Sequence, residues 1–311
     1  MQTNKFKLPE FKKLLAKPNS GIAIVYRPET EAAISSANLL IQWLKSKSHK
    51  VYTAPGQAQL KGSIALKSFN EALSKNIGLV VVLGGDGTYL RAVRMLKEVQ
   101  IPILGVNLGS LGFLTTIRSE DLFSKLEATL EGKGIELSAR TMMSLEWLNK
   151  SKSSTNVKVI NNYLSLNDIV VERGPSSHLI DLKLNMEKHF VSNIKADAMV
   201  ISSPTGSTAY NLAGGGPIVH PDAKVLTVTP VAAHSLTSRP LIFPDTTQLE
   251  LSLQGQCKLA HIIVDGGKVG ELLPGQLLRI KKHPLPHWMI QAKGHNYYEL
   301  LREKLSFGER N

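Results

Sequence analysis

The sequence predicts two domains of different fold class: an α/β N-terminal domain with a doubly wound, mostly parallel sheet, and a β-rich C-terminal domain with antiparallel, sandwich-like sheets. Three observations predict this division. Strand patterns alternate with helical patterns in the first part, the hydrophobic period changes after Gly132-Lys133-Gly134, and 311 residues suffice for two domains of ordinary size. We place the α/β domain at residues 1–134 and about 283–311, and the β-rich domain at 135–282.

The first part of the chain has the alternation of strands and helices that a parallel sheet requires. Strands are predicted at residues 22–25, 51–53, 79–83 and 103–106. The helix that follows the first strand has an apolar face formed by Ala33, Ala37, Leu40, Ile41 and Leu44. A second helix is predicted at 88–97, with Leu90, Val93 and Leu96 facing inward. The β-branched run at 79–83 is typical of a strand that is covered on both faces.

The second part alternates apolar and polar residues, which is typical of half-buried antiparallel strands. The pattern is clear at 180–186 and at 249–253. A helical pattern returns at 297–304, and we expect this segment to rejoin the first domain.

Composition and charge limit the classes of partner. The formal charge is +12 and the pI is about 9.6, which favours anionic partners such as nucleotides, nucleic acid or an anionic membrane. Because the basic residues form no long block, nucleic acid is the less favoured partner. The one cysteine, Cys257, excludes a disulfide within the chain and favours a reducing, cytoplasmic compartment.

No membrane partner is expected from the apolar segments. Residues 198–221 lack charge, but they are interrupted by proline and several glycines. The first 20 residues have no apolar core of the length that a secretory signal needs.

The strongest local motif is Gly84-Gly85-Asp86-Gly87-Thr88, between a predicted buried strand and a helix. Ligands bind at the carboxyl ends of strands in such sheets, and the N-terminus of a helix attracts phosphate. Thr88 is predicted to cap the helix. A carboxylate beside phosphate is useful if Asp86 binds a metal ion or accepts a proton from an attacking hydroxyl. The alternative interpretation is a tight turn with Asp86 as a turn residue.

Two further segments could bind a polar ligand. A second glycine-rich loop, 107–113, follows the next strand and is expected at the same edge of the sheet. Residues 202–217 combine small hydroxyl residues, glycines and Tyr210. The P-loop pattern and the Gly-x-Gly-x-x-Gly dinucleotide fingerprint are absent.

In this order, these segments resemble the NAD kinase family over nearly the whole chain after residue 20. Gly-Gly-Asp-Gly-Thr is shared with lipid kinases, so the resemblance depends on its combination with residues 104–115, 166–168 and 204–211. It implies an enzyme that transfers the terminal phosphate of ATP, or of polyphosphate, to the 2′-hydroxyl of the adenosine ribose of NAD. The product would be NADP, and the enzyme would use Mg²⁺ or another divalent cation held mainly by the donor phosphates.

The resemblance also implies roles for individual residues and an assembled state. Asp86 would deprotonate the ribose hydroxyl, while Gly84, Gly85, Gly87 and Thr88 would bind the donor phosphates. The residues expected to bind NAD are Asp86, Gly87, Asn167, Asp168, Asp197, Thr208, Ala209 and Tyr210. The first domain would then be the nucleotide-binding domain and the second the NAD-binding domain, in a homodimer or homotetramer.

Some features depart from the family pattern, and some alternatives stay open. Asp168 replaces the more frequent Glu, and Ser110 replaces a larger residue. A lipid kinase, a non-catalytic dinucleotide-binding module and a basic nucleic-acid-binding protein are the alternatives. The sequence leaves open the choice between NAD and NADH, the choice between ATP and polyphosphate, and feedback regulation.

Overall fold

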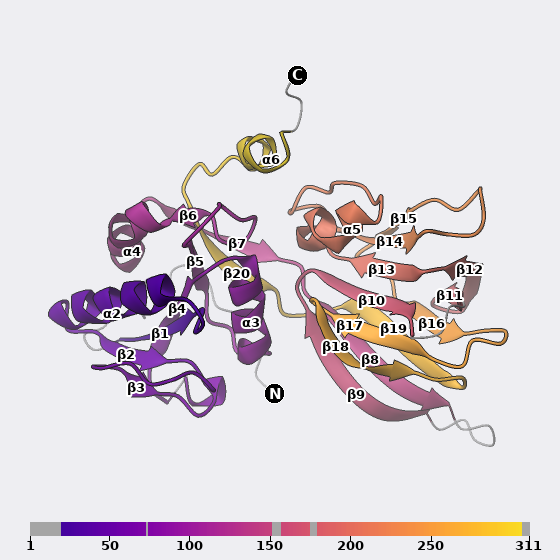
Figure 1. Ribbon diagram of the computed structural model, residues 1–311, viewed down its shortest axis with the longest axis horizontal. Helices are drawn as coiled ribbons and strands as arrows, with labels where there is room; N and C mark the ends of the chain where they lie inside the picture. Colours follow the sequence, from indigo (N-terminus) through magenta and orange to yellow (C-terminus); the bar gives the residue numbers. More distant parts are fainter. Residues whose placement is uncertain (1–19, 73, 151–156, 175–178, 307–311) are drawn as a thin grey trace. The chain divides into compact units, whose positions relative to one another are not determined.

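The computed structural model describes residues 20–306 except 73, 151–156 and 175–178. The chain divides into two compact units (Figure 1). One contains the described residues up to Ala139 together with those from His287 onward, and the other is Arg140–Pro286.

The first unit is built on an eight-stranded, mostly parallel sheet with the order β3-β2-β1-β4-β5-β20-β7, in which β6 also pairs with β5. Its strands are β1 (Gly21–Tyr26), β2 (Lys50–Thr53), β3 (Ile64–Ala65), β4 (Ile77–Leu83), β5 (Ile103–Asn107), β6 (Ile117–Arg118), β7 (Ile135–Arg140) and β20 (His287–Ala292). Its helices are α2 (Glu31–Ser46), α3 (Asp86–Leu96), α4 (Leu122–Glu131) and α6 (Tyr297–Leu305), with short 3₁₀ turns η1 (Phe69–Glu71) and η2 (Ser119–Asp121).

The sequence pattern predicted this core well. The expected apolar face of α2 is the buried face, and every residue of β4 is buried. The inward face of α3 differs from the prediction, because the helix begins at Asp86 and buries Tyr89, Ala92, Val93 and Leu96, while Leu90 is only partly buried. The strand β7 lies after the domain boundary predicted at residue 134. It nevertheless pairs within the first sheet, and the first unit extends to Ala139.

The second unit contains two six-stranded sheets, with orders β15-β14-β13-β10-β17-β18 and β12-β11-β16-β19-β8-β9. The strands of the first sheet are β10 (Asp168–Arg173), β13 (Ala198–Ser202), β14 (Val225–Val231), β15 (Leu241–Pro244), β17 (Ala260–Val264) and β18 (Gly267–Leu272). Those of the other are β8 (Met143–Lys150), β9 (Val157–Ser165), β11 (Ile180–Met186), β12 (His189–Ala196), β16 (Leu249–Leu253) and β19 (Gln276–Lys282). A turn, η3 (Thr205–Thr208), and a short helix, α5 (Tyr210–Ala213), follow β13.

One apolar core joins the two sheets of this unit, as the sandwich-like prediction requires. Ile169 and Val171 of β10 belong to it, together with alternate residues of the other sheet such as Leu182 and Leu251. Because side chains alternate along a strand, Asp168 and Val170 lie on the opposite face of β10. Val170 packs there in a smaller cluster with Ala198 and Val200.

None of the helices in the described residues is long and apolar enough to cross a membrane.

Candidate functional site

The glycine-rich turn of the first unit joins β4 to α3. Gly85 is the N-cap of α3, and the backbone N–H groups of Thr88 and Tyr89 both donate to its carbonyl oxygen. The predicted cap by Thr88 is therefore wrong, because Thr88 lies inside the helix and no side chain caps its start. The first helical residues, Asp86 and Gly87, have no intrahelical acceptor for their N–H groups, as at every helix start. Gly87 is exposed, so this start is open to a ligand.

The Asp86 carboxylate is bound by the loop that follows β5. Its Oδ1 accepts the N–H groups of Leu114 and Thr115 and the Thr115 hydroxyl, each at 3.0 Å. Its Oδ2 accepts the N–H of Phe113 at 2.9 Å. A Cβ on Gly112 would collide with Asp86 Oδ1, so the close approach of this loop requires glycine. Oδ2 has one such donor against three for Oδ1, and it keeps room for another.

A second layer of hydrogen bonds holds the loop around Asp86. The Asn107 amide donates to Thr115 Oγ1 at 2.8 Å, and Asn107 Oδ1 accepts the N–H of Gly109 at 2.6 Å. Thr115 is fully buried and Asn107 is 5% exposed. The two glycine-rich loops are thus joined through side chains, as expected for neighbouring strands that end at one edge of the sheet.

In the second unit, Asn167 and Asp168 lie where the chain passes from β9 to β10. Asp265 fixes this connection by accepting the N–H groups of Leu166, Asn167 and Asp168 at 2.9, 2.8 and 3.2 Å. Sequence reasoning missed Asp265. The Asp265-Gly266 pair between two strands was a recognisable hairpin signal, but nothing in the sequence linked it to residues about a hundred positions earlier.

Asp168 is a buried carboxyl, with 5% of its surface exposed. Burial, and then the charge of Asp265, raise the pKa of Asp168 to about 7, although the backbone N–H of Tyr210 lowers it. Both causes disfavour the charged form. Asp168 therefore changes its charge close to neutral pH.

Two buried oxygens beside this connection have no hydrogen-bond partner: Asn167 Oδ1 and Thr205 Oγ1. Their residues are 8% and 9% exposed. The η3 turn packs directly on Asn167, since a Cβ on Gly206 would collide with the Asn167 backbone. Unpaired buried polar atoms are rare, and a ligand that supplies donors is one physical explanation for them.

The other predicted residues of this unit separate into two places. Thr208 ends η3, Ala209 follows it and the exposed Tyr210 begins α5, so these three lie next to Thr205 and Asp168. Asp197 precedes β13 at the opposite end from Ser202, the partner of Asp168, and its carboxylate lies 3.4 Å from Arg173 Nε. Within the second unit of one chain, the structure does not bring Asp197 to the other residues predicted to bind NAD.

The described residues contain no group of three or more His, Cys, Asp or Glu side chains placed to hold a metal ion. At the turn, Asp86 already accepts four donors from the neighbouring loop. N–H groups directed at a carboxylate oxygen oppose a cation at the same oxygen, so the turn by itself does not fit a protein-held divalent ion.

Comparisons with known sequences match both units. The ATP-NAD kinase N-terminal domain matches residues 22–134, and the ATP-NAD kinase C-terminal domain matches residues 166–291. The NAD kinase of Bdellovibrio bacteriovorus is 48% identical over 96% of each chain. The NAD kinase of Geotalea daltonii is 34% identical over 93% of this chain and 99% of its own.

Solved structures share the fold. A yeast NADH kinase crystallised with NADH superposes with a TM-score of 0.83 at 24% identity, over 95% of this chain and 89% of the other. An NAD kinase from Archaeoglobus fulgidus crystallised with ATP superposes with a TM-score of 0.70 at 23% identity, over 91% and 99% of the two chains.

The hydrogen bonds around Asp86 predict a cost for Thr115→Val. The change keeps the shape but removes the hydroxyl that joins Asn107 to Asp86. We expect the free energy of unfolding to fall by about 1 to 3 kcal/mol, because the buried Asn107 amide loses its acceptor and Asp86 Oδ1 loses one of its three donors. Urea unfolding measures this, with the adjacent Thr116→Val as control. Equal effects of both changes would contradict the account.

The buried Asp168 predicts a pH-dependent effect of Asp168→Asn. Because the folded-state pKa of about 7 exceeds the ordinary 3.8, the stability from its protonated form is complete below pH 3.8 and is lost as pH rises through 7. Asparagine cannot ionise. We expect the stability of the variant relative to wild type to increase by about 1 to 3 kcal/mol between pH 5 and pH 8. A difference that stays constant in urea unfolding at the two pH values would exclude this titration.

Proposed function

Because this chain belongs to the ATP-NAD kinase family, we propose specific roles in phosphoryl transfer for the two sets of residues described above. The protein is an NAD kinase, which transfers the terminal phosphoryl group of ATP to the 2′-hydroxyl of the adenosine ribose of NAD and forms NADP. Use of polyphosphate in place of ATP stays a prediction.

Asp86 is the proposed general base. Its Oδ2 accepts the ribose hydroxyl proton as the ribose oxygen forms a bond to the terminal phosphorus and the bond to the ADP oxygen breaks. The observation that supports this role is the set of four donors that fixes the carboxylate, with Oδ2 carrying only one of them. Phosphoryl transfer depends mainly on positioning, and general-base help typically contributes about 10² to 10⁴ in rate.

The start of α3 is the proposed binding site for the donor phosphates. Gly84, Gly85, Gly87 and Thr88 surround the first turn, where backbone N–H groups and the helix dipole favour negative charge. Gly84, which directly follows β4, is buried. Gly87 is exposed, so the backbone at the start of the helix is accessible to a phosphate group. This arrangement suits a phosphate group without a lysine of the P-loop type.

A divalent cation such as Mg²⁺ enters, in this proposal, with the donor phosphates. Magnesium commonly keeps several waters and binds substrate phosphates with few protein ligands. The cation would neutralise phosphate charge. The residues of the chain would hold the acceptor hydroxyl and the phosphates of the donor.

We propose that the second unit binds NAD, in agreement with the expectation from the sequence that it is the NAD-binding domain. Asn167 Oδ1 and Thr205 Oγ1 are acceptors without donors, and NAD carries amide, amino and hydroxyl donors. Asp168, Thr208, Ala209 and Tyr210 lie beside them and complete the proposed contacts. The contact of Asp86 and Gly87 with the reacting ribose stays a prediction from the family resemblance.

Three other predictions stay as they were. Asp197 is at the opposite end of β13 and pairs with Arg173, so its contact with NAD has no support within one chain. Assembly as a homodimer or homotetramer follows from the family resemblance alone. The cytoplasmic location agrees with the single cysteine.

Asp86→Asn tests the role of the general base. The amide keeps the size of the side chain but cannot take the proton, so we expect NADP formation to fall at least about 10²-fold. Thermal stabilisation of the protein by NAD should survive, because the other residues proposed to bind NAD remain. The assay couples NADP to an NADP-specific dehydrogenase.

Asp121→Asn, which removes a carboxylate at η2, is the matched control and should keep wild-type activity. A fully active Asp86→Asn enzyme would refute the general-base role. Phosphorylation of a diacylglycerol or sphingosine substrate, with no NADP from the wild type, would favour the lipid kinase alternative.

Thr205→Val tests the unpaired hydroxyl. If that hydroxyl accepts a donor from NAD, its loss should raise the KM for NAD about tenfold while the stability of the free protein stays equal or increases. Thr205→Ser keeps the hydroxyl and should retain a KM close to wild type. An unchanged KM in the valine variant would show that NAD does not use this oxygen.

A further inference from the structure

Asp265 occupies a hairpin turn that does not itself need a charge. Asp265 and Gly266 join β17 to β18, with φ values of 46° and 76°. Both residues are in the left-handed region, which Asn-Gly and Asp-Gly adopt equally well in two-residue hairpins. The turn would therefore form equally well without the negative charge of the Asp265 carboxylate.

The carboxylate reaches across to the connection between β9 and β10. Besides the three backbone N–H groups, its Oδ1 accepts the Ser165 hydroxyl at 2.7 Å. The N–H of Asp265 in turn donates to the Asp168 carbonyl at 3.0 Å. The hairpin thus fixes the backbone of the residues proposed to bind NAD.

Asp168 and Asp265 form a buried pair of acids, each 5% exposed. Two like charges in a poorly solvated site repel, so the pair holds a proton more tightly than either acid alone. Burial raises the pKa of both acids. Four donors to Asp265 oppose this effect by favouring its charged form, whereas the carboxyl of Asp168 receives only the backbone N–H of Tyr210. The proton therefore belongs on Asp168.

We infer that Asp265 is a positioning residue for NAD, whose negative charge keeps the Asp168 carboxyl protonated, so that NAD binding above neutral pH takes up a proton. This inference rests on the proposed NAD-binding role of Asp168. NAD brings a negatively charged pyrophosphate and excludes water from the pair. A neutral Asp168 reduces the repulsion and can donate a hydrogen bond to a ribose or phosphate oxygen.

Few other ionisable groups surround Asp168. Its neighbour β13 has no charged residue, and η3 and α5 carry only the phenol of Tyr210. On β17, His261 lies at the far end, paired in register with Glu172. On β18, Lys268 bonds to Glu271 at 2.9 Å. Asp265 is thus the charged group that acts on Asp168, and burial followed by this charge raises the pKa of that carboxyl.

Titration calorimetry of NAD on the wild-type enzyme tests the inference without any variant. Measured at pH 7.5 in two buffers of different ionisation enthalpy, binding should take up a fraction of one proton. The dissociation constant should rise about tenfold per pH unit well above pH 7, as for one proton linked to binding. Asp168→Asn should bind NAD with no such uptake and a flat pH profile. Carboxyl ¹³C NMR, assigned with this variant, should show Asp168 titrating near pH 7 while Asp265 stays ionised.

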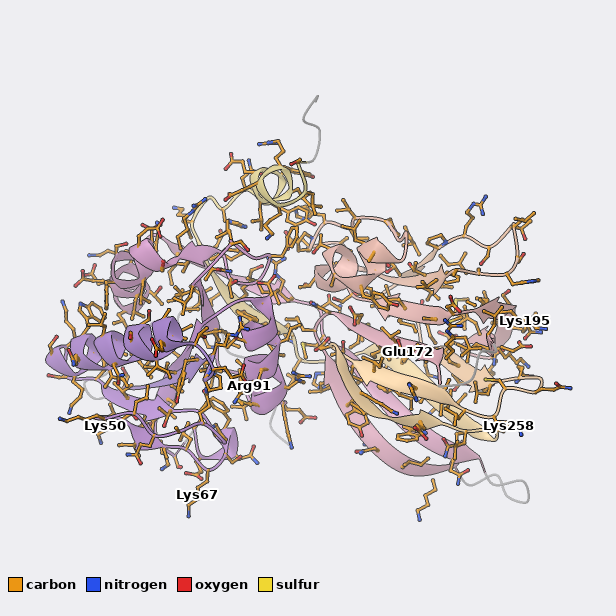
Figure 2. All side chains as sticks on the ribbon, viewed as in Figure 1. Lys50, Lys67, Arg91, Glu172, Lys195 and Lys258 are labelled. Atoms are coloured by element: carbon orange, nitrogen blue, oxygen red, sulfur yellow. The ribbon has the colours of Figure 1, made fainter. Side chains whose placement is uncertain are left out.

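Asp265→Asn separates the charge from the turn, because Asn-Gly supports the same hairpin. Without the negative charge, the rise in the dissociation constant should begin at lower pH. If Asp265 had a purely structural role, its replacement would weaken NAD binding equally at every pH. The pH at which the dissociation constant begins to rise, the midpoint of the profile, would then be unchanged. Glu172→Gln is the matched control. It removes a charge from β10, the strand that begins with Asp168, at the opposite end from Asp168 (Figure 2), and it should leave the pH midpoint of NAD binding unchanged.

Several results would overturn the inference. These are proton release or no proton exchange by the wild type, an unshifted midpoint in Asp265→Asn, a pH profile that survives in Asp168→Asn, or a proton found on Asp265. If Asp265→Asn does not fold, the wild-type calorimetry and NMR still decide. Any of these results with normal NADP formation would leave the kinase assignment intact, whereas a wild type that neither binds NAD nor forms NADP would refute the proposed function itself.

Discussion

The carboxylate of Asp86 depends on hydrogen bonds from the loop after β5, and the rest of the first unit's site depends on this interaction. Backbone N–H groups of Phe113, Leu114 and Thr115 and the Thr115 hydroxyl hold both carboxylate oxygens. Parallel neighbours β4 and β5 end at the same edge, so the two loops meet. The interaction fixes the acid where α3 begins, close to backbone amides that favour phosphate.

The second unit uses the same physical device for another purpose. Asp265 also satisfies its oxygens with the N–H groups of a neighbouring connection, but here a second acid, Asp168, is buried beside it. In the first unit, the donors fix the position of a single carboxylate, whose less bonded Oδ2 is the proposed acceptor of the ribose proton. In the second, one carboxylate holds its charge and thereby keeps a proton on the other. In both places, backbone N–H groups and one hydroxyl, of Thr115 or Ser165, supply the donors instead of lysine or arginine.

The sequence was most informative where local pattern decides structure. The apolar face of α2, the buried strand β4 and the glycine-rich turn before α3 follow from spacing and residue type alone. Long-range pairing was beyond it. The strand β7 joins the first sheet by pairing with β20, which is far from it in sequence. Asp265 likewise accepts hydrogen bonds from a connection about a hundred residues earlier. Gly85 caps α3 in place of Thr88, because the helix starts two residues before the predicted position.

The central claim is that Asp86 Oδ2 faces the ribose hydroxyl that becomes phosphorylated. A crystal structure of the enzyme with NAD and a non-hydrolysable ATP analogue measures this most directly. The account predicts Oδ2 about 2.6 to 3.2 Å from the 2′-oxygen, with the contacts of Oδ1 to Leu114 and Thr115 retained. A complex in which both oxygens of Asp86 stay bound to the loop while the 2′-oxygen contacts another residue would contradict it.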